Sequence, residues 1–420
     1  MESSSDLPTW DGKILSLTAV SPINIALIKY WGKCDEIEII PINSSLSITL
    51  NCDDLCSTTT VSLGESYEES ELILNGKSEG FSDRIKRMLS FLTDSIPAEG
   101  AKAWDTVKGE EITIPKEDLL KMKVHVESTN NFPTASGVAS SSSGLSCLAL
   151  CLNKVYGCEM DLGECSRLAR LGSGSACRSL FGGFVIWDKG FDLTNFEDIR
   201  NITPEQVLEA SKNSKAIQVK DESHWDEIAL VICVATSEKK KIASTKGMKD
   251  SVDTSEFLAY RATNIVPKRL ENITKAIEDK DWNTFTEIII KESNSLHASC
   301  LDTYPPIFYM NETTKNLASL THDINQNFYE PVAAYTVDAG ANCFLITKKK
   351  HLNYLIDLVS DVAGLDDSKI KFNFKDEIET EHNQIDGDLI SKTLDPYRGK
   401  IELQQLIVTR VGKGCHFVAQ

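Results

Sequence analysis

The 420-residue sequence predicts an α+β protein built in two halves. Segments with alternating or continuous apolar residues, typical of strands, crowd the first half. Amphipathic helical segments dominate between residues 250 and 326. Strands and helices therefore segregate instead of alternating as in a repeating βαβ series. The stretch over 191–225 is polar, and we place the domain boundary near residue 220, with one domain over 1–220 and the other over 221–420.

The N-terminal half opens with strands. Residues 14–20 and 23–31 are predicted strands, separated at Ser21-Pro22 because proline cannot donate to a sheet ladder. Alternation and β-branched residues predict further strands at 44–51, 57–63, 123–129 and 181–190.

Helices follow in the same half. An amphipathic helix is predicted over 83–92, with Ile85, Met88, Leu89 and Leu92 facing inward. An apolar helix is predicted over 145–157. A further helix has Asp161 as its N-cap and Gly172 past its end. The segment 95–120 is polar and charged, and we expect a surface excursion there.

The C-terminal half begins with a buried strand and continues mainly as helices. The predicted elements are a strand at 227–236, helices at 250–263, 265–279, 281–300 and 309–326, a strand–turn–strand at 331–347, a helix at 352–362 and a last strand at 403–411.

Composition excludes several classes of function. The formal net charge of −18 argues against nucleic acid or anionic lipid as the main partner. The sequence lacks a run of 18 apolar residues, so no membrane span is expected. The polar N-terminus carries no secretory signal, and we expect a cytoplasmic protein with reduced cysteines. His297-x-x-Cys300 has no second His/Cys pair nearby in the sequence, which argues against a protein-bound metal.

A serine-rich loop is the strongest local signal for chemistry. The segment PTASGVASSSSG, residues 133–144, follows a predicted strand and opens a helix. Its small side chains would let phosphate oxygens reach backbone N–H groups at the positive end of the helix dipole. It is not a GxxxxGK[ST] loop, because the lysine is missing. A flexible linker is the weaker alternative, since an apolar helix follows at once.

Charged residues in three other segments are candidates for the same site. Arg178, in GSGSACRSLFGG, offers a planar fork for a carboxylate or phosphate. Asp338 ends an apolar strand before a glycine turn and could accept a proton. Lys29 and Lys33 could face phosphates or pair with Asp338. Taken singly, each has an ordinary alternative: an arginine on a surface turn, an aspartate that stabilises a turn, or lysines that snorkel at a strand end.

Several motifs together resemble a known family. The serine-rich loop resembles the phosphate loop of the GHMP kinase superfamily. Within it, the sequence resembles the diphosphomevalonate decarboxylases through SPINIALIKYWGK, PINSSLSITLN, ESTNNFPTASGVASSSSG, RLGSGSACRSLFGGFV, ESNSLHASCLDTYPPIFYMNETT and YTVDAGAN. The similarity runs from about residue 16 to 347, and IVTRVGKG fits it near the end.

The resemblance implies a fold and a reaction. The fold would be the two-part GHMP kinase architecture. Its N-terminal part is a mixed α/β, phosphate-binding domain, its C-terminal part is ferredoxin-like α+β, and the active site lies in the cleft between them. The reaction would be ATP-dependent and Mg²⁺-dependent decarboxylation of mevalonate 5-diphosphate to isopentenyl diphosphate. The resemblance also implies a homodimer.

The resemblance carries roles to individual residues. Asp338 would orient or deprotonate the 3-hydroxyl, Arg178 would hold the C1 carboxylate, and Lys29 would lie near the transferring phosphoryl group. The expected substrate-binding residues are Tyr30, Trp31, Gly32, Lys33, Arg84, Ser173, Gly174, Ser175, Ala176, Cys177, Arg178, Ser244 and Thr245. The expected ATP-binding residues are Pro133, Ser136, Gly137, Val138, Ala139, Ser140, Ser141 and Ser142, with Mg²⁺ carried by ATP and held through Ser141.

One departure and two alternatives remain at this point. The family commonly has arginine after KYWGK, and Cys34 stands there instead, which removes a charge beside Lys33 and would weaken diphosphate binding. A relative that phosphorylates the 3-hydroxyl without decarboxylation is one alternative, and a catalytically silent sensor on the same fold is the other. The joint presence of Lys29, Arg178 and Asp338 disfavours the first. The intact loop and base disfavour the second.

Overall fold

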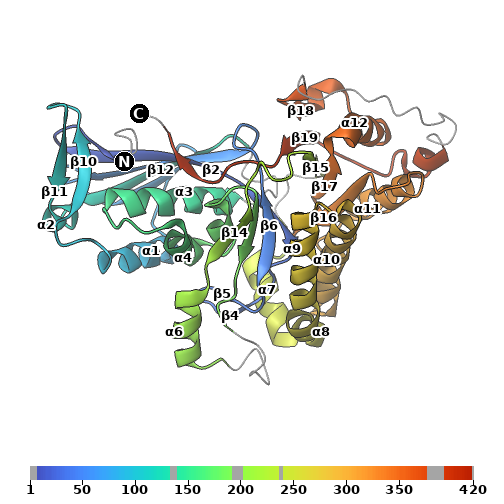
Figure 1. Cartoon of the computed structure of the whole chain (residues 1–420), viewed down its shortest axis with the longest axis horizontal. Coiled ribbons are helices and arrows are strands. Elements are labelled where there is room, and N and C mark those ends of the chain that lie inside the picture. The colour runs from blue at the N-terminus through green and yellow to red at the C-terminus, as the bar shows by residue number, and fades with distance from the viewer. Residues whose placement is uncertain (1–6, 133–139, 192–201, 236–239, 376–391, 419–420) are drawn as a thin grey trace.

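The computed structural model describes residues 7–132, 140–191, 202–235, 240–375 and 392–418. It has the predicted α+β architecture in two parts. A large sheet with helices below it forms one side of the molecule, and a smaller sheet above a group of long helices forms the other (Figure 1).

The large sheet belongs to the N-terminal part and lies above its helices in Figure 1. Its strand order is β11-β10-β1-β2-β7-β12-β8-β9, and β20 also pairs with β2. The strands are β1 (Thr9–Trp10), β2 (Ile14–Pro22), β7 (Cys56–Gly64), β8 (Glu71–Leu74), β9 (Lys77–Glu79), β10 (Ala101–Asp105), β11 (Glu110–Ile114), β12 (Lys123–Asn130) and β20 (His416–Phe417).

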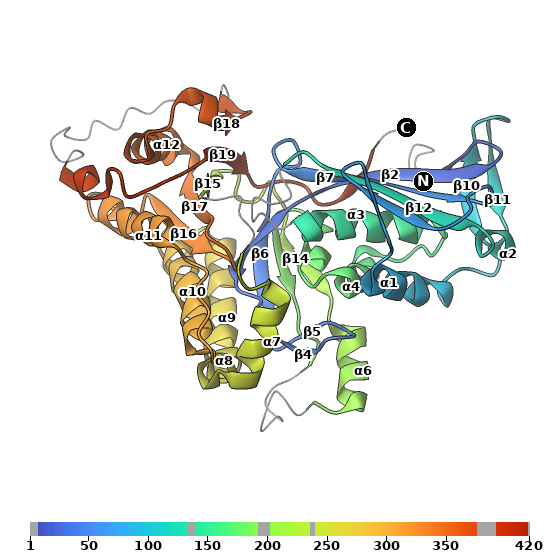
Figure 2. The ribbon, with the colours of Figure 1, turned by 180° about the vertical axis from the view of Figure 1, so that it is seen from behind.

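Helices cover one face of this sheet. In both ribbon views α3 lies against the sheet, with α1 and α4 beside it (Figure 2). Alternate residues of β2 and β7, among them Leu15, Leu17, Val61 and Leu63, are fully buried against these helices. The helices are α1 (Asp83–Thr93), α2 (Lys116–Leu119), α3 (Ser140–Val155) and α4 (Leu162–Gly172).

A second, four-stranded sheet lies between the two parts and carries the start of the candidate site. Its order is β14-β13-β6-β3, and both of its faces are largely buried. Its strands and the nearby elements are β3 (Asn24–Ile28), β4 (Lys33–Asp35), β5 (Ile40–Pro41), β6 (Ser45–Thr49), α5 (Ala176–Ser179), β13 (Phe184–Trp187), α6 (Pro204–Asn213) and β14 (Ala216–Lys220).

The C-terminal part is a five-stranded sheet with order β16-β17-β15-β19-β18. Helices α9 to α11 lie below it, and α12 lies near β15 and β17 (Figure 1). The elements are β15 (Ile228–Val234), α7 (Ser244–Thr254), α8 (Glu256–Tyr260), the π-helix η2 (Arg261–Ile265), α9 (Val266–Asp279), α10 (Trp282–Asp302), α11 (Glu312–Asn325), β16 (Ala333–Val337), β17 (Cys343–Lys348), α12 (Lys349–Ala363), η3 (Asp367–Lys369), β18 (Ile370–Phe372), η5 (Asp395–Tyr397) and β19 (Gln405–Arg410).

The end of the chain returns to the N-terminal part. After β19, the chain crosses to the large sheet, where Ala19 and Val20 of β2 pair with Phe417 and His416 of β20 (Figures 1 and 2). The C-terminal segment therefore ties the two parts together. The domain boundary near residue 220 stays a prediction.

Most predicted elements are present, and Asp161 caps α4 as expected by accepting a hydrogen bond from Glu164 N–H at 2.8 Å. The break at Ser21-Pro22 is wrong, because β2 pairs with β7 through Pro22, and the break falls at Ile23. Proline is tolerated there since it is the last residue of the strand.

Three other predictions need correction. Residues 95–120 form the β10–β11 hairpin and α2, with Ala101, Ala103, Ile114 and Leu119 in the core. The polar stretch 191–225 contains α6 and β14. Gly172 is the last residue of α4 and not the residue after it. Short strands with charged residues on their outer face lack the apolar runs that identify buried ones.

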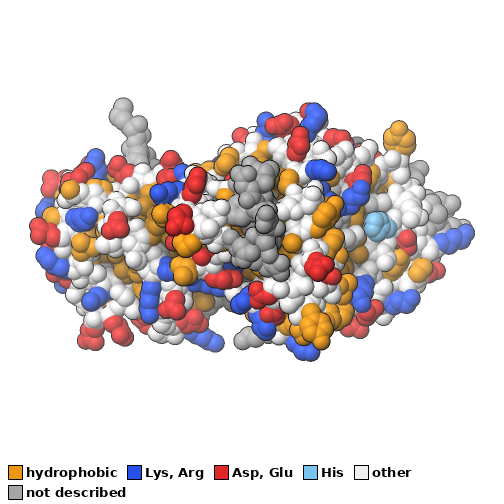
Figure 3. Space-filling model, turned by 90° about the horizontal axis from the view of Figure 1, so that it is seen from below, with side chains coloured by type: hydrophobic (Ala, Val, Ile, Leu, Met, Phe, Trp, Pro, Cys, Tyr) orange, Lys and Arg blue, Asp and Glu red, His pale blue; other side chains and the backbone are white. Residues whose placement is uncertain are grey.

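The surface is mixed in charge. On the face shown in Figure 3, acidic and basic side chains are interspersed over both parts. All twelve cysteines are among the described residues and are free thiols. In the ranges that the structure describes, no helix is both long and apolar enough to cross a bilayer.

Candidate active site

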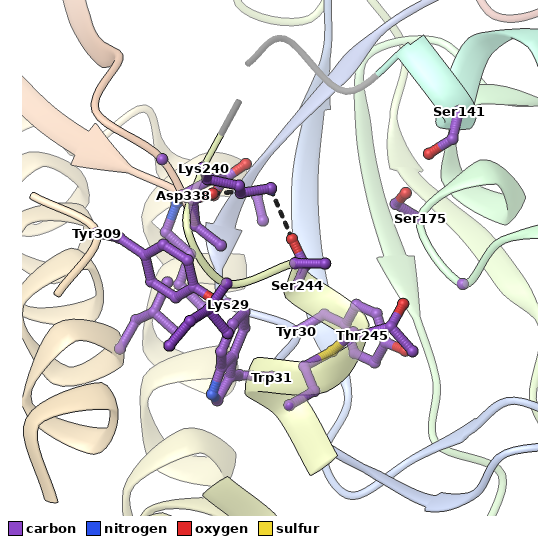
Figure 4. Close-up of a pocket in the computed structure, with 18 of the residues that line it drawn as sticks. Lys29, Tyr30, Trp31, Ser141, Ser175, Lys240, Ser244, Thr245, Tyr309 and Asp338 are labelled. Carbon is purple, nitrogen blue, oxygen red and sulfur yellow. Dashed lines mark hydrogen bonds and ion pairs between the residues drawn. The ribbon is translucent and has the colours of Figure 1, made fainter. Parts of the chain in front are cut away.

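A cavity of about 1060 Å³ lies at the junction of the two parts. Its walls come from the end of β3, the segment before α5, the N-terminus of α7, residues 306–311 and the turn between β16 and β17. In Figure 4, Ser141 and Ser175 lie across the cavity from Lys240, Asp338 and Tyr309. The cavity therefore brings together residues from both ends of the sequence.

Lys29 and Asp338 form an ion pair in this cavity. Lys29 is the first residue after β3, and Asp338 is the first residue after β16, 309 positions later. The distance between Lys29 Nζ and Asp338 Oδ1 is 2.6 Å (Figure 4). The lysine side chain is 1% exposed, whereas the aspartate side chain is 41% exposed. The carboxylate is thus held by a buried cation on one side and faces the open cavity on the other.

Arg178 is a buried cation on the cavity wall. Its Nη1 donates to Ser45 Oγ at 2.7 Å and its Nε to Asn24 Oδ1 at 3.3 Å, while its guanidinium lies 5.8 Å from the Trp187 ring centroid. Among the described residues, no carboxylate lies within ion-pair distance of it. Burial lowers the pKa of Arg178. A buried charge without an ionic partner is rare, which indicates a place for an anion.

A group of cationic and hydroxyl side chains lines the region around α7. Arg84 Nη2 donates to Thr245 Oγ1 at 3.3 Å, which links α1 to α7 across the cavity. Ser244 Oγ accepts a hydrogen bond of 2.7 Å from Lys240 Nζ. Lys33 also lines the cavity, but its ammonium is paired with Glu36.

Tyr30, Trp31 and Tyr309 form an aromatic wall. The Trp31 and Tyr309 rings meet edge to face at 5.7 Å, and Trp31 Nε1 donates to Ser251 Oγ at 3.0 Å. Tyr30 packs edge-on against Trp187 at 4.7 Å. The hydroxyls of Tyr30 and Tyr309 are buried without a hydrogen-bond partner among the described residues. Burial raises the pKa of both phenols, so they are neutral donors.

The expected ATP-binding loop is only partly described. Ser141, in the first turn of α3, lines the cavity. Ser142 is fully buried and does not line it. Ser140 begins α3, but its side chain lies outside what the structure describes. Five predicted residues lie outside the described residues altogether: Pro133, Ser136, Gly137, Val138 and Ala139.

Three of the predicted substrate-binding residues, Gly32, Ala176 and Cys177, do not line the cavity. Ser173, Gly174 and Ser175 line the cavity as expected. The neighbouring Ala176 and Cys177 do not, because both side chains are fully buried. Gly32 does not line the cavity either. It has φ of +100°, and a Cβ there would lie 2.8 Å from Ile42 Cδ1, so the position requires glycine.

Cys34 lies in β4 and is partly buried. Its thiol donates to Ile40 O at 3.5 Å, and burial raises its pKa to about 12. Cys34 is not among the cavity-lining residues. The expectation that the loss of an arginine here weakens diphosphate binding stays a prediction.

Asn24, Lys240 and Tyr309 line the cavity, but the sequence analysis did not predict them as site residues. Asn24 connects Arg178 to the segment before α5, since its Nδ2 donates to Ser175 O at 3.0 Å. Lys240 Nζ donates to Ala339 O at 2.9 Å, beside Asp338, and burial lowers its pKa. Asn24 and Tyr309 lie inside the motifs SPINIALIKYWGK and YPPIFYMNETT, which were the available signal.

His297, on α10, lies near the Lys29–Asp338 ion pair. Its environment leads us to expect that the stability of the fold depends on pH. Burial and the charge of Lys29 lower the pKa of His297 from 6.5 to about 4. An unfolded chain would bind this proton near pH 6.5, so protonation favours unfolding below that pH. The free energy of unfolding should fall by about 3 kcal/mol between pH 6.5 and 4 through this histidine.

Chemical denaturation across this pH range measures the effect. His297→Gln should flatten the decline, and His125→Gln, on β12 and not part of the cavity wall, is the control for replacing a histidine elsewhere. An unaltered decline in His297→Gln would mean that other groups cause it.

Comparisons with known proteins agree over nearly the whole chain. Residues 21–197 match the model of the diphosphomevalonate decarboxylase-like N-terminal domain, and residues 230–418 match that of the mevalonate 5-diphosphate decarboxylase C-terminal domain. Diphosphomevalonate decarboxylase of Candida albicans is 42% identical over 82% of this chain and 87% of its own length.

Solved structures give the same result. Mevalonate diphosphate decarboxylase from Trypanosoma brucei has a TM-score of 0.82 and 34% identity, covering 96% of this chain and 98% of its own. A structure described as MDDEF in complex with MVAPP, AMPPCP and magnesium has a TM-score of 0.70 and 29% identity, covering 97% of this chain and 100% of its own.

Proposed function

The chain belongs to the mevalonate 5-diphosphate decarboxylase family, and we propose that the cavity around Lys29, Arg178 and Asp338 is its active site. The reaction is the ATP-dependent conversion of mevalonate 5-diphosphate to isopentenyl diphosphate, ADP, phosphate and CO2, a step of the mevalonate pathway. Neither a 3-kinase without decarboxylation nor a silent sensor is supported by these relatives.

The observation that carries the site assignment is the buried Arg178 guanidinium without a carboxylate partner among the described residues. It shares one cavity with the Lys29–Asp338 pair. A substrate carboxylate at Arg178 would supply the missing anion, and the opposite end of the substrate would then meet the cations and hydroxyls around α7. We assign Arg178 to the C1 carboxylate on this ground.

Asp338 and Lys29 serve the first chemical step. The 3-hydroxyl oxygen bonds to the γ-phosphorus of ATP while the bond to ADP breaks, and Asp338 accepts the hydroxyl proton. Lys29 holds this carboxylate 2.6 Å from its ammonium and places a positive charge near the transferring group.

Decarboxylation follows because phosphate is a better leaving group than hydroxide. The C3–O bond breaks and the phosphate departs with the electron pair. The C1–C2 bond then breaks, and its electrons form the C2=C3 double bond as CO2 leaves. Arg178 keeps the carboxylate oriented until this bond breaks.

The residues around the first turn of α3 fit a nucleotide. Ser141 has a small hydroxyl side chain on the cavity wall, at the positive end of a 16-residue helix. Ser141 would hold Mg²⁺ together with the ATP phosphates. When bound, Mg²⁺ neutralises charge on the phosphates.

Three further assignments belong to this proposal. We assign the chain to the cytoplasm and to a homodimer, and we keep one domain over 1–220 and one over 221–420. Sedimentation equilibrium of the purified chain tests the dimer: the mass of one 46.5 kDa chain at all concentrations would contradict it.

We assign Arg84 to the part of the site that binds the diphosphate of the substrate. Arg84→Met should raise KM for mevalonate 5-diphosphate roughly 10-fold, since a charge-assisted hydrogen bond contributes about 1.5 kcal/mol, and should leave KM for ATP unchanged. Initial rates of ADP formation measure both constants.

Arg87 offers the matched control. It lies one turn along α1, does not line the cavity, and its guanidinium lies 3.5 Å from Glu36 O. Arg87→Met should keep both KM values. Equal effects of the two replacements would contradict the assignment of Arg84.

A further inference from the structure

The backbone of Lys29 is held by a buried ion pair between Arg261 and Glu292. The Lys29 N–H donates to Glu292 Oε2 at 3.2 Å. The Lys29 carbonyl accepts from Arg261 Nη2 at 3.3 Å and from Asn43 Nδ2 at 3.1 Å. Arg261 Nη2 and Glu292 Oε2 are 2.5 Å apart, and both side chains are fully buried.

These side-chain hydrogen bonds take the place of strand pairing where β3 ends. The pairing of β3 with β6 is irregular between Ala26 and Ile28, and Lys29 follows the last residue of β3. Irregular strand ends of this kind commonly re-aim a side chain at active sites. Buried backbone groups need partners, and here they are the side chains of Arg261 in η2, Glu292 in α10 and Asn43 before β6.

The chemistry of the Arg261–Glu292 pair indicates that it serves to position Lys29 and not to stabilise the fold. Burying an ion pair is costly, and an apolar replacement is often as stable. Burial opposes ionisation of Glu292, but the charges of Arg261 and Arg269 together lower its pKa below the ordinary value. Arg261 also lies at the start of a π-helix, a distortion frequent at functional sites.

We propose that Arg261 and Glu292 are positioning residues that fix the Lys29 backbone, and through it the Lys29 ammonium, against Asp338. This inference rests on the proposed catalytic role of Lys29. Neither Arg261 nor Glu292 lines the cavity, so both act through Lys29 and not on the substrate.

The neighbouring Arg269 gives a matched control. Its Nη1 pairs with the other carboxylate oxygen of Glu292, Oε1, at 2.6 Å, and it donates to Lys291 O at 3.2 Å. It makes no hydrogen bond to Lys29. Arg261→Met and Arg269→Met therefore each remove one cation from the same carboxylate, but only the first also removes a hydrogen bond to the Lys29 carbonyl.

The test is a double-mutant cycle with Lys29→Met, measured as kcat and KM for ADP formation. Arg261→Met should lower kcat on the order of 10²-fold, the effect of misplacing a catalytic group, with both KM values within about 2-fold. Arg269→Met should keep kcat within about 2-fold. In the Lys29→Met background, Arg261→Met should cause no further loss.

Each contrary result has its own meaning. An unchanged kcat in Arg261→Met, or losses that multiply with Lys29→Met, overturns the positioning role. A normal kcat in Lys29→Met alone overturns the catalytic role of Lys29 first, and the positioning role with it. Arg261 Nη1 also donates to Asn43 Oδ1 at 3.4 Å. If Arg261→Met does not fold, Arg261→Lys takes its place, since one ammonium beside Glu292 cannot also reach Asn43 and the Lys29 carbonyl.

Discussion

Replacement of Asp338 by asparagine is expected to lower turnover by roughly 10²–10⁴-fold, the usual contribution of a general base. The amide would keep the size of the carboxylate and could still accept a hydrogen bond from Lys29, but it could not take the proton of the 3-hydroxyl. ADP formation under saturating substrates measures the loss.

Nucleotide binding is the internal control for this variant. Because Asp338 lies across the cavity from Ser141, the dissociation constant of a non-hydrolysable ATP analogue should stay within about 2-fold of the wild-type value. Normal turnover would remove Asp338 from the role of base. Lost nucleotide binding would instead mean that the replacement disturbs the whole cavity.

Replacement of Arg178 by glutamine is expected to lower kcat/KM, with a loss of transition-state stabilisation of about 2–5 kcal/mol. This is the cost of leaving a buried carboxylate without its charged partner. The guanidinium is held by Asn24 and Ser45, so it cannot be replaced by a neighbouring cation without rearrangement. Steady-state kinetics with mevalonate 5-diphosphate measures this quantity.

Replacement of Arg170 is the control that separates the loss of a substrate contact from the loss of a buried charge. It is also buried, on α4, and donates to the carbonyls of Ser214 and Ser211, but it does not line the cavity. Arg170→Gln should lower the melting temperature while kcat/KM stays near the wild-type value. If both variants lose kcat/KM equally, Arg178 acts through stability and not through the substrate.

Local patterns in the sequence predicted the elements that supply the site. The apolar run before Lys29 predicted β3, and the run before Asp338 predicted β16. Arg178, after a run of small residues, was predicted to bind a carboxylate or phosphate, but the short helix α5 that carries it was not predicted. Family resemblance then supplied the roles, because no periodicity indicates which charge meets which substrate atom.

Contacts between distant parts of the chain were not predictable in the same way. Lys240 is one of three successive lysines, and nothing in that run distinguishes the one that reaches Ala339 O. Glu292 is one acidic residue on a long helix, and its pairing with Arg261 depends on how η2 meets α10. Such pairs arise from tertiary packing, which sequence patterns do not encode residue by residue.

The ratio of CO2 released to ADP formed tests the central claim most directly. Purified protein, Mg-ATP and mevalonate 5-diphosphate labelled at C1 are incubated together, and both products are counted over the same interval. The proposed active site predicts one CO2 for each ADP. ADP without CO2 would contradict it, since the cavity would then phosphorylate the 3-hydroxyl without completing the decarboxylation assigned to Arg178.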